Sequence, residues 1–75
     1  MKTSQDTQLE QIYIIVKGSA YGILRKDNSD RVYIEYYCLD GSEVADYRDR
    51  KHEIEAIVSE AKVYCIKYNL ILWSY

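Results

Sequence analysis

Cys38, Cys65 and His52 are the side chains of this chain that could form a cysteine–histidine nucleophile. Catalysis of that kind needs the thiol and the imidazole within hydrogen-bond reach of each other. If residues 50–68 form one helix, thirteen positions separate His52 from Cys65, which is roughly 20 Å along the helix axis. The spacing excludes that pair, whereas Cys38 with His52 stays open without other support.

Other catalytic and metal-binding patterns are missing from the sequence. One histidine and two isolated cysteines supply no C-x-x-C or H-x-x-x-H pair that could chelate a metal from one element. The sequence contains no G-x-S-x-G, P-loop or dinucleotide fingerprint. Carboxylates are so plentiful that no pair of them stands out as an acid–base couple. We therefore expect a protein that is not an enzyme and binds neither a metal nor another cofactor.

The two cysteines have two interpretations. They are too few for a stapled secreted scaffold, and residues 1–11 lack the apolar run of a signal peptide. The apolar stretch at residues 70–73 is too short to cross a bilayer. These features predict a cytoplasmic chain with reduced thiols and no membrane contact. Cys38 and Cys65 are then buried apolar side chains, or a disulfide or thiol switch that joins a helix to the sheet.

A basic cluster lies at the start of the predicted helix, where the helix dipole normally favours acidic residues. Arg50, Lys51 and His52, with Arg48 nearby, could hold a phosphate or an acidic patch of a partner together with the free helix N–H groups. The alternative is an ordinary solvated surface, because four carboxylates could neutralise the cluster: Glu43, Asp46, Asp49 and Glu53.

Aromatic composition is the most informative feature of the chain. The sequence has nine tyrosines, one tryptophan and no phenylalanine. Tyrosine suits surfaces that are apolar at one end and wet at the other, so we expect a half-exposed aromatic face. Such a face could recognise a protein, could stack unpaired bases of a single-stranded nucleic acid, or could simply pad a small core. The net charge of −2 gives no basic footprint for duplex nucleic acid.

Runs of β-branched and aromatic residues predict four strands before the helix, at residues 9–17, 21–26, 31–39 and 43–48. Asp40-Gly41 indicates a two-residue hairpin between the last two of them. That hairpin opposes Tyr37 with Val44, and it places Ala45 on the core face. Val44 then lies on the other face, beside charged and tyrosine side chains.

One long helix is expected at about residues 50–68, with Asp49 as its N-cap and Asn69 at its C-terminal end. Its apolar side chains form a stripe about 100° wide. Val63 and Ile66 do not fit the stripe, so an extended conformation for residues 63–68 is the alternative. The stripe consists of Ile54, Ile57, Val58, Ala61, Cys65 and Tyr68, with Tyr64 at its edge.

A final strand at residues 70–75 completes the predicted fold. We expect the returning helix to deliver it antiparallel to the first strand, and a right-handed crossover to place these two very apolar strands side by side. The result is a single α+β domain spanning residues 1–75, with a frayed lead-in at residues 1–8. It combines a mostly antiparallel sheet of four to five strands with one long helix on one face.

One helix covers one face of such a sheet, so the other face must meet solvent or a binding partner. We expect some combination of Tyr13, Tyr33, Tyr37, Trp73 and Tyr75 on that face. The predicted function is a small non-enzymatic protein-binding module, acting as a regulator, adaptor or inhibitor; inhibitors encoded by phages or mobile elements are one such class. Its binding residues are Tyr33, Tyr37 and Trp73 as anchors, with Arg48 and Arg50 supplying charge, and the same face could also form a homodimer. Single-stranded nucleic-acid binding is the alternative.

Overall fold

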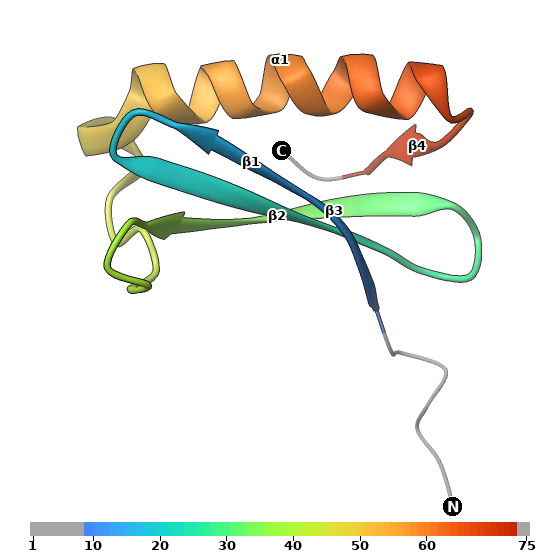
Figure 1. The fold of residues 1–75 in the computed structure, drawn as a ribbon, viewed down its shortest axis with the longest axis horizontal. Coiled ribbons are helices and arrows are strands. Elements are labelled where there is room, and N and C mark those ends of the chain that lie inside the picture. Colours follow the sequence, from blue (N-terminus) through green and yellow to red (C-terminus); the bar gives the residue numbers. More distant parts are fainter. Residues whose placement is uncertain (1–8, 74–75) are drawn as a thin grey trace, which may run out of the picture.

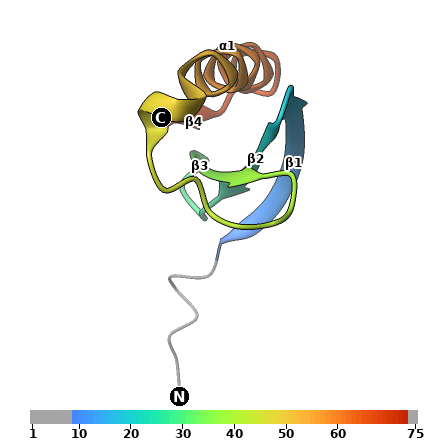
Figure 2. The ribbon, with the colours of Figure 1, turned by 90° about the vertical axis from the view of Figure 1, so that its left-hand side faces the viewer.

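A computed structural model describes residues 9–73 of the chain. Three long strands are followed by a helix and a short strand: β1 (Glu10–Lys17), β2 (Ala20–Lys26), β3 (Arg31–Cys38), a 3-10 helix (Tyr47–Arg50), α1 (Lys51–Lys67) and β4 (Ile71–Leu72). The strands form one sheet in the order β1-β2-β3-β4, in which only the β3–β4 pair is parallel. Figures 1 and 2 show α1 lying along one face of the sheet. The predicted α+β class, with a mostly antiparallel sheet and one helix on one face, is confirmed.

The core lies between α1 and the side of the sheet that faces it. Gly22, in the centre of β2, lets the helix approach closely, since a Cβ at this position would lie 2.7 Å from Cγ2 of Ile57. The approach keeps water out of a small but continuous apolar layer. Its buried members are Ile15, Ala20, Leu24, Val32, Ile34, Tyr36, Val44, Ile57, Ala61 and Cys65.

The turn after β3 differs from the predicted two-residue hairpin. The N–H of Cys38 donates to the carbonyl of Ser42 (2.8 Å), and the N–H of Gly41 donates to the carbonyl of Cys38 (2.9 Å). Residues 39–41 therefore form a three-residue loop, in which Gly41 has a φ of +92°. Only glycine adopts such a backbone conformation without strain, and it is the usual residue at this position of a three-residue hairpin loop.

The longer loop shifts the register after it by one residue. Tyr37 forms its bridge with Glu43 rather than with Val44. Because side chains alternate between the faces of a strand, this shift turns Val44 into the core and Ala45 outward. The prediction for both residues was wrong for that reason.

The strand expected at residues 43–48 is reduced to this isolated bridge. The last hydrogen bond back to β3 runs from the N–H of Val44 to the carbonyl of Tyr36 (3.2 Å). Two residues later, the Asp46 carboxylate accepts from the N–H of Arg48 (3.0 Å) and caps the 3-10 helix. An aspartate that bonds the backbone ahead of it offers the chain an alternative to a strand ladder, and here the alternative prevails.

Helix α1 confirms the predicted helix to within one residue at each end. It continues through Lys67, so the extended alternative for residues 63–68 was wrong. Val63 and Ile66 do not fit the stripe because they point into solvent, with exposed fractions of 66% and 80%. Asp49 does not cap α1; the N-cap position is Arg50, which makes no capping bond with its side chain.

The C-terminal end of α1 has the expected asparagine. Asn69 adopts a φ of +59°, its N–H donates to the carbonyl of Ile66 (3.3 Å), and the N–H of Leu70 donates to the carbonyl of Cys65 (2.7 Å). These two bonds satisfy carbonyls that the helix leaves without intrahelical partners and turn the chain back toward the sheet.

The chain then enters β4, which pairs in parallel with β3 through Arg31–Ile71 and Val32–Leu72. The prediction that this strand would lie antiparallel beside the first strand was therefore wrong. Because residues 43–48 do not extend the sheet, the outer edge of β3 stays open, and the helical connection brings β4 to it. Among the described residues, no segment pairs with the outer edge of β1.

Candidate binding surface

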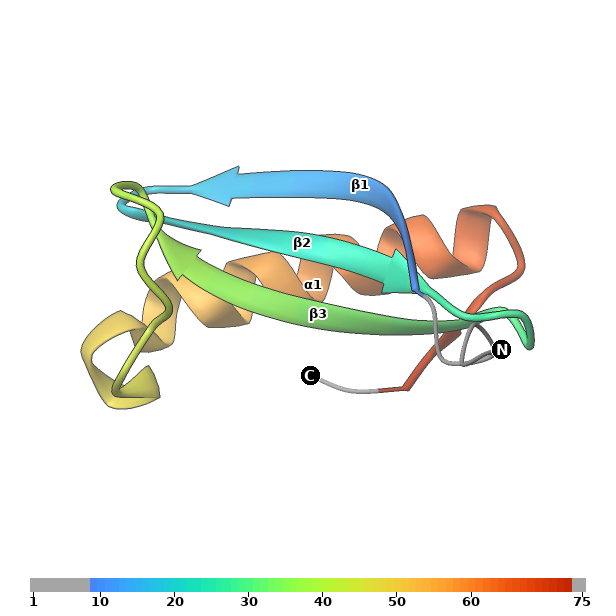
Figure 3. The same ribbon diagram turned by 90° about the horizontal axis from the view of Figure 1, so that it is seen from below.

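The side of the sheet opposite α1 is not covered by any other element of the described part of the chain (Figure 3). We call this side the open face. The register sets its residues in rows: Val16–Tyr21–Tyr37, Ile14–Ile23–Glu35 and Gln11–Arg25–Tyr33, with Arg31 beside Ile71 at the β3–β4 edge. Val16 keeps 60% of its surface exposed, and Ile14 and Ile71 are also exposed. Each of the four strands therefore contributes aliphatic or aromatic side chains to this face, with Arg25, Arg31 and Glu35 between them.

Tyr37 is held in place by its neighbours on this face. Its ring stacks on that of Tyr21, with centroids 5.5 Å apart. Its hydroxyl donates to Oε1 of Glu35 (2.9 Å), and the same oxygen accepts from Nε of Arg25 (2.9 Å). The Arg25 bond is the main cause of a lowered pKa of Glu35, whereas the bond to Glu35 raises the pKa of Tyr37. The network is ordered, and the charges of Arg25 and Glu35 offset each other.

Tyr33 and Trp73 belong to a second cluster at the β3–β4 corner. Nε of Arg31 donates to Asp27 (2.8 Å), the Tyr33 hydroxyl donates to the same carboxylate (3.4 Å), and the Arg31 guanidinium lies 5.2 Å from the centroid of the Trp73 ring. Burial acts to raise the pKa of Asp27, but backbone N–H donors from Arg31 and Ser29 outweigh it and lower that pKa. Trp73 itself remains 57% exposed.

The predicted anchors Tyr33 and Tyr37 thus lie on one face, and Trp73 lies at its corner. Tyr13 lies on the helix side of the sheet, so it does not belong to the combination of aromatic residues found on the open face. Tyr75 lies outside the described residues.

Arg48 and Arg50 do not join the open face. Arg48 forms two bonds to the carboxylate of Asp46, at 3.2 and 3.1 Å, while its side chain stays 90% exposed. Arg50 is half-buried, and its Nη2 lies 4.0 Å from the sulfur of Cys38. Both arginines extend from the 3-10 helix rather than from the sheet.

The three residues of the predicted anion site do not come together around one cavity. Of Arg50, Lys51 and His52, only Arg50 lines the neighbouring cavity of about 230 Å³, whereas Lys51 and His52 point into solvent. The other charged residues around that cavity are acidic: Glu43, Asp46 and Asp49. The surroundings favour the alternative interpretation, in which carboxylates neutralise the basic cluster.

The cysteines lie at opposite ends of the helix. Cys38 is beside Arg50, which directly precedes α1. Cys65 is buried in α1 fifteen residues after Arg50, which is roughly 22 Å along the helix axis. A disulfide between them within one chain is therefore excluded. Burial raises the pKa of the Cys65 thiol. In residues 9–73, no cluster of three or more histidine, cysteine or acidic side chains could hold a metal ion.

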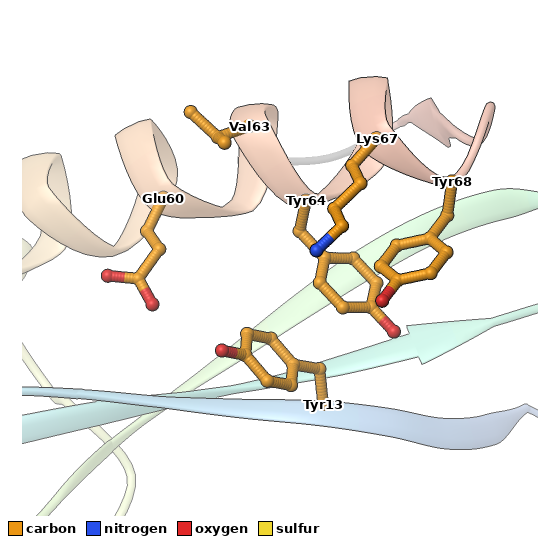
Figure 4. A pocket seen from close by; sticks show the side chains of 6 residues that line it. All are labelled: Tyr13, Glu60, Val63, Tyr64, Lys67 and Tyr68. Atoms are coloured by element: carbon orange, nitrogen blue, oxygen red, sulfur yellow. The ribbon is translucent and has the colours of Figure 1, made fainter.

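On the helix side of the sheet, a separate cluster of tyrosines lies in a groove between β1 and the C-terminal half of α1 (Figure 4). The Tyr13 ring stacks on Tyr64 with centroids 4.5 Å apart, and Tyr64 contacts Tyr68 at 4.7 Å. The groove has a volume of about 220 Å³, and Glu60, Val63 and Lys67 complete its lining. We call it the tyrosine groove. The sequence indicated it only through Tyr68 in the helix stripe and Tyr64 at its edge.

Comparisons with known proteins add no identification. No protein-family model matches the chain, and neither the curated proteins nor the solved structures contain a match to it. In the described part of the chain, α1 is too short and too polar to span a bilayer.

Proposed function

We propose that this chain is a non-enzymatic, cytoplasmic protein-binding module that acts as a small regulator, adaptor or inhibitor through its open face. The observation that supports this proposal is the continuous uncovered row of Val16, Tyr21 and Tyr37, together with Trp73 at the corner. Tyrosine and tryptophan are preferred anchors at protein interfaces because they bury a large area at a small loss of conformational freedom.

Order in the free molecule also supports protein recognition. Tyr37 is stacked and hydrogen-bonded before any partner arrives, and Tyr33 is bonded to Asp27. A surface that is already fixed loses less entropy on binding than a mobile one.

Charge distinguishes this function from single-stranded nucleic-acid binding. A nucleic-acid groove needs cations free to contact phosphates beside the stacking rings. The two arginines on the open face are each bonded to a carboxylate, Arg25 to Glu35 and Arg31 to Asp27. The face therefore presents aromatic rings with little net positive charge.

The test is affinity capture from the native host with four immobilised baits. We expect the wild-type chain and Ile66→Ala to capture the same protein, because Ile66 is exposed on the far side of α1. Tyr37→Ala and Trp73→Ala should each weaken that binding by about tenfold or more. Circular dichroism establishes that all baits are folded.

Two results would contradict the proposal. One is a partner that binds all four baits equally, which would place the binding surface elsewhere. The other is tight binding of a mixed-sequence single strand that disappears steeply with added salt, which would support the nucleic-acid alternative.

A further inference from the structure

The outer edge of β1 lacks the protection that edge strands normally have. β1 lies at the end of the strand order and carries the sequence EQIYIIVK over eight residues. Its outer backbone groups have no partner strand among residues 9–73. Edge strands normally carry inward-pointing charges or prolines that prevent pairing with another chain, but residues 12–16 of β1 are apolar or aromatic.

A bulge restricts which part of this edge can pair regularly. The β1–β2 register shifts between Gln11 and Tyr13, so Ile12 is the extra residue. From Tyr13 to Lys17 the register is regular, with Tyr13, Ile15 and Lys17 on the helix side and Ile14 and Val16 on the open face. Five residues are therefore available for a regular ladder with a new strand.

The tyrosine groove runs beside this part of the edge and has opposite charges at its two ends. Glu60 lies at one end, where it is bonded to Lys17 at 2.7 Å. Lys67 lies at the other end, with its ammonium 5.5 Å from the centroid of the Tyr68 ring. Figure 4 shows this arrangement, with Tyr13 below the helix between the two charged residues.

We propose that a second copy of this chain pairs with β1 across a two-fold axis that passes through Ile15. Antiparallel pairing in this register opposes Ile15 with the same residue of the second copy, Ile14 with its Val16, and Tyr13 with its Lys17. Residues directly opposite one another then lie on the same side of the joined sheet, as antiparallel pairing requires. The bulge stays outside the paired segment.

The charges support this occupant. The two-fold rotation places the Lys17–Glu60 end of each copy against the Tyr13–Lys67 end of the other. Lys17 of one copy then approaches the Tyr13 ring of the other, a favourable cation–aromatic arrangement, and Glu60 approaches Lys67. Lys17 already offsets Glu60 within each copy, so the complementarity comes from Lys67 of one copy, which the rotation brings to the Glu60 carboxylate of the other.

The pairing also covers exposed apolar surface on the helix side. Tyr13, which is 40% exposed, and Val63 lie on the flank that the second copy would approach. A chain of 75 residues buries a small core, so association adds burial that one copy lacks. The open face remains free in both copies, so this inference goes beyond the proposed function and does not depend on it.

Sedimentation equilibrium between about 1 and about 200 µM tests the pairing, with the wild-type chain expected to dimerise in this range. Lys67→Glu places a carboxylate opposite Glu60 at two symmetric positions and should weaken the dimer by about tenfold or more. Lys51→Glu is the matched control, because it makes the same charge change at the opposite end of α1 and should leave the dimer unchanged.

Mixing two variants tests the two-fold geometry itself. Glu60→Lys alone sets lysines against Lys67, and Lys67→Glu alone sets glutamates against Glu60, so each homodimer is weakened. An equal mixture restores an opposite-charge pair at both positions, and the heterodimer should form about tenfold more tightly than either homodimer. The Lys17–Glu60 bond is lost in both copies of the Glu60→Lys homodimer and in one copy of the heterodimer, so its loss alone cannot make the heterodimer tighter than both homodimers.

Two results would overturn the inference. A wild-type chain that stays monomeric at about 200 µM would show that the edge does not pair. A wild-type dimer that Lys67→Glu leaves unchanged, or a mixture no tighter than the homodimers, would place the dimer interface on another surface. Neither result bears on binding through the open face, which the capture experiment tests separately.

Discussion

Tyr36 provides a sharp test of the packing between α1 and the sheet. Its side chain lies on the core face of β3 with 7% of its surface exposed, and its ring meets Tyr47 edge-on at 5.4 Å. Among the described residues, no group forms a hydrogen bond with its buried hydroxyl. Replacement by phenylalanine keeps the ring and removes the unpaired oxygen.

The expected gain at neutral pH follows from desolvation. A buried polar group without a partner costs about 1–3 kcal/mol, and part of that cost is recovered when the group is deleted. We therefore expect Tyr36→Phe to raise the free energy of unfolding by about 1 kcal/mol near pH 7.

Alkaline pH enlarges the difference. Burial, with a smaller contribution from Tyr47, raises the pKa of Tyr36 from 10.0 to about 12. Below pH 10 both the folded and the unfolded chain keep this proton, so stability is unaffected. Between pH 10 and 12 the unfolded chain loses the proton first, which lowers the free energy of unfolding. Two pKa units correspond to a full loss of about 2.7 kcal/mol above pH 12, of which about 1.4 kcal/mol is reached at pH 11, and Tyr36→Phe removes that loss.

Urea unfolding followed by circular dichroism at about pH 7 and about pH 11 measures both effects. Tyr37→Phe is the control for the effect near pH 7, because its hydroxyl donates to Glu35 and its removal should destabilise the fold. Ionisation of tyrosines that do not contact Tyr36 affects wild type and Tyr36→Phe equally. If Tyr36→Phe is less stable near pH 7, the hydroxyl has a favourable partner; if the alkaline loss is unchanged, burial does not control its ionisation.

Two further predictions concern the helix–sheet contact. Gly22→Ala should lower the free energy of unfolding by about 1–3 kcal/mol in a urea titration, because the added Cβ would lie 2.7 Å from Ile57. If the stability is unchanged, α1 is not held this close to β2. Cys38 should react with a thiol reagent at least about tenfold faster than Cys65 in single-cysteine variants, because Cys65 is 3% exposed and its pKa is raised by burial. Equal rates would contradict the burial of Cys65.

The sequence predicted the helix well because its signals are local. Apolar spacing set the buried face around Ile57 and Ala61, and Asn69 marked the end, where a left-handed residue closes the last turn. The start was predicted less well. Asp49 is a reasonable cap in the sequence, but it lies inside the 3-10 helix that Asp46 caps, so Arg50 takes the N-cap position of α1.

The length of the loop after β3 and the position of β4 in the sheet could not be predicted from any short segment of the sequence alone. Asp40-Gly41 is compatible with two-residue and three-residue loops, since a glycine with positive φ serves in both. The one-residue difference reversed the faces of Val44 and Ala45, and the cap formed by Asp46 ended the strand. Once that strand was lost, the free edge of β3 became the site for β4, which could not be foreseen from residues 70–75 alone.

The open face was predicted in part, and the tyrosine groove was missed. Tyr33 and Tyr37 alternate with core residues in β3, so their side of the sheet was readable from the pattern. Tyr13 lies in an apolar run without such alternation, and the bulge at Ile12 alters the face assignment along β1. Its contact with Tyr64 joins segments about fifty residues apart, which sequence spacing does not reveal.

The paired charges on the open face have a consequence for the speed of encounter. Because Arg25 and Arg31 each have a carboxylate partner, the face projects little long-range electric field. A partner would reach it by unguided diffusion, with an association rate constant on the order of 10⁵–10⁶ M⁻¹s⁻¹ that changes little with ionic strength. Long residence of the complex would then come from slow dissociation, controlled by how closely the partner packs around the fixed rings.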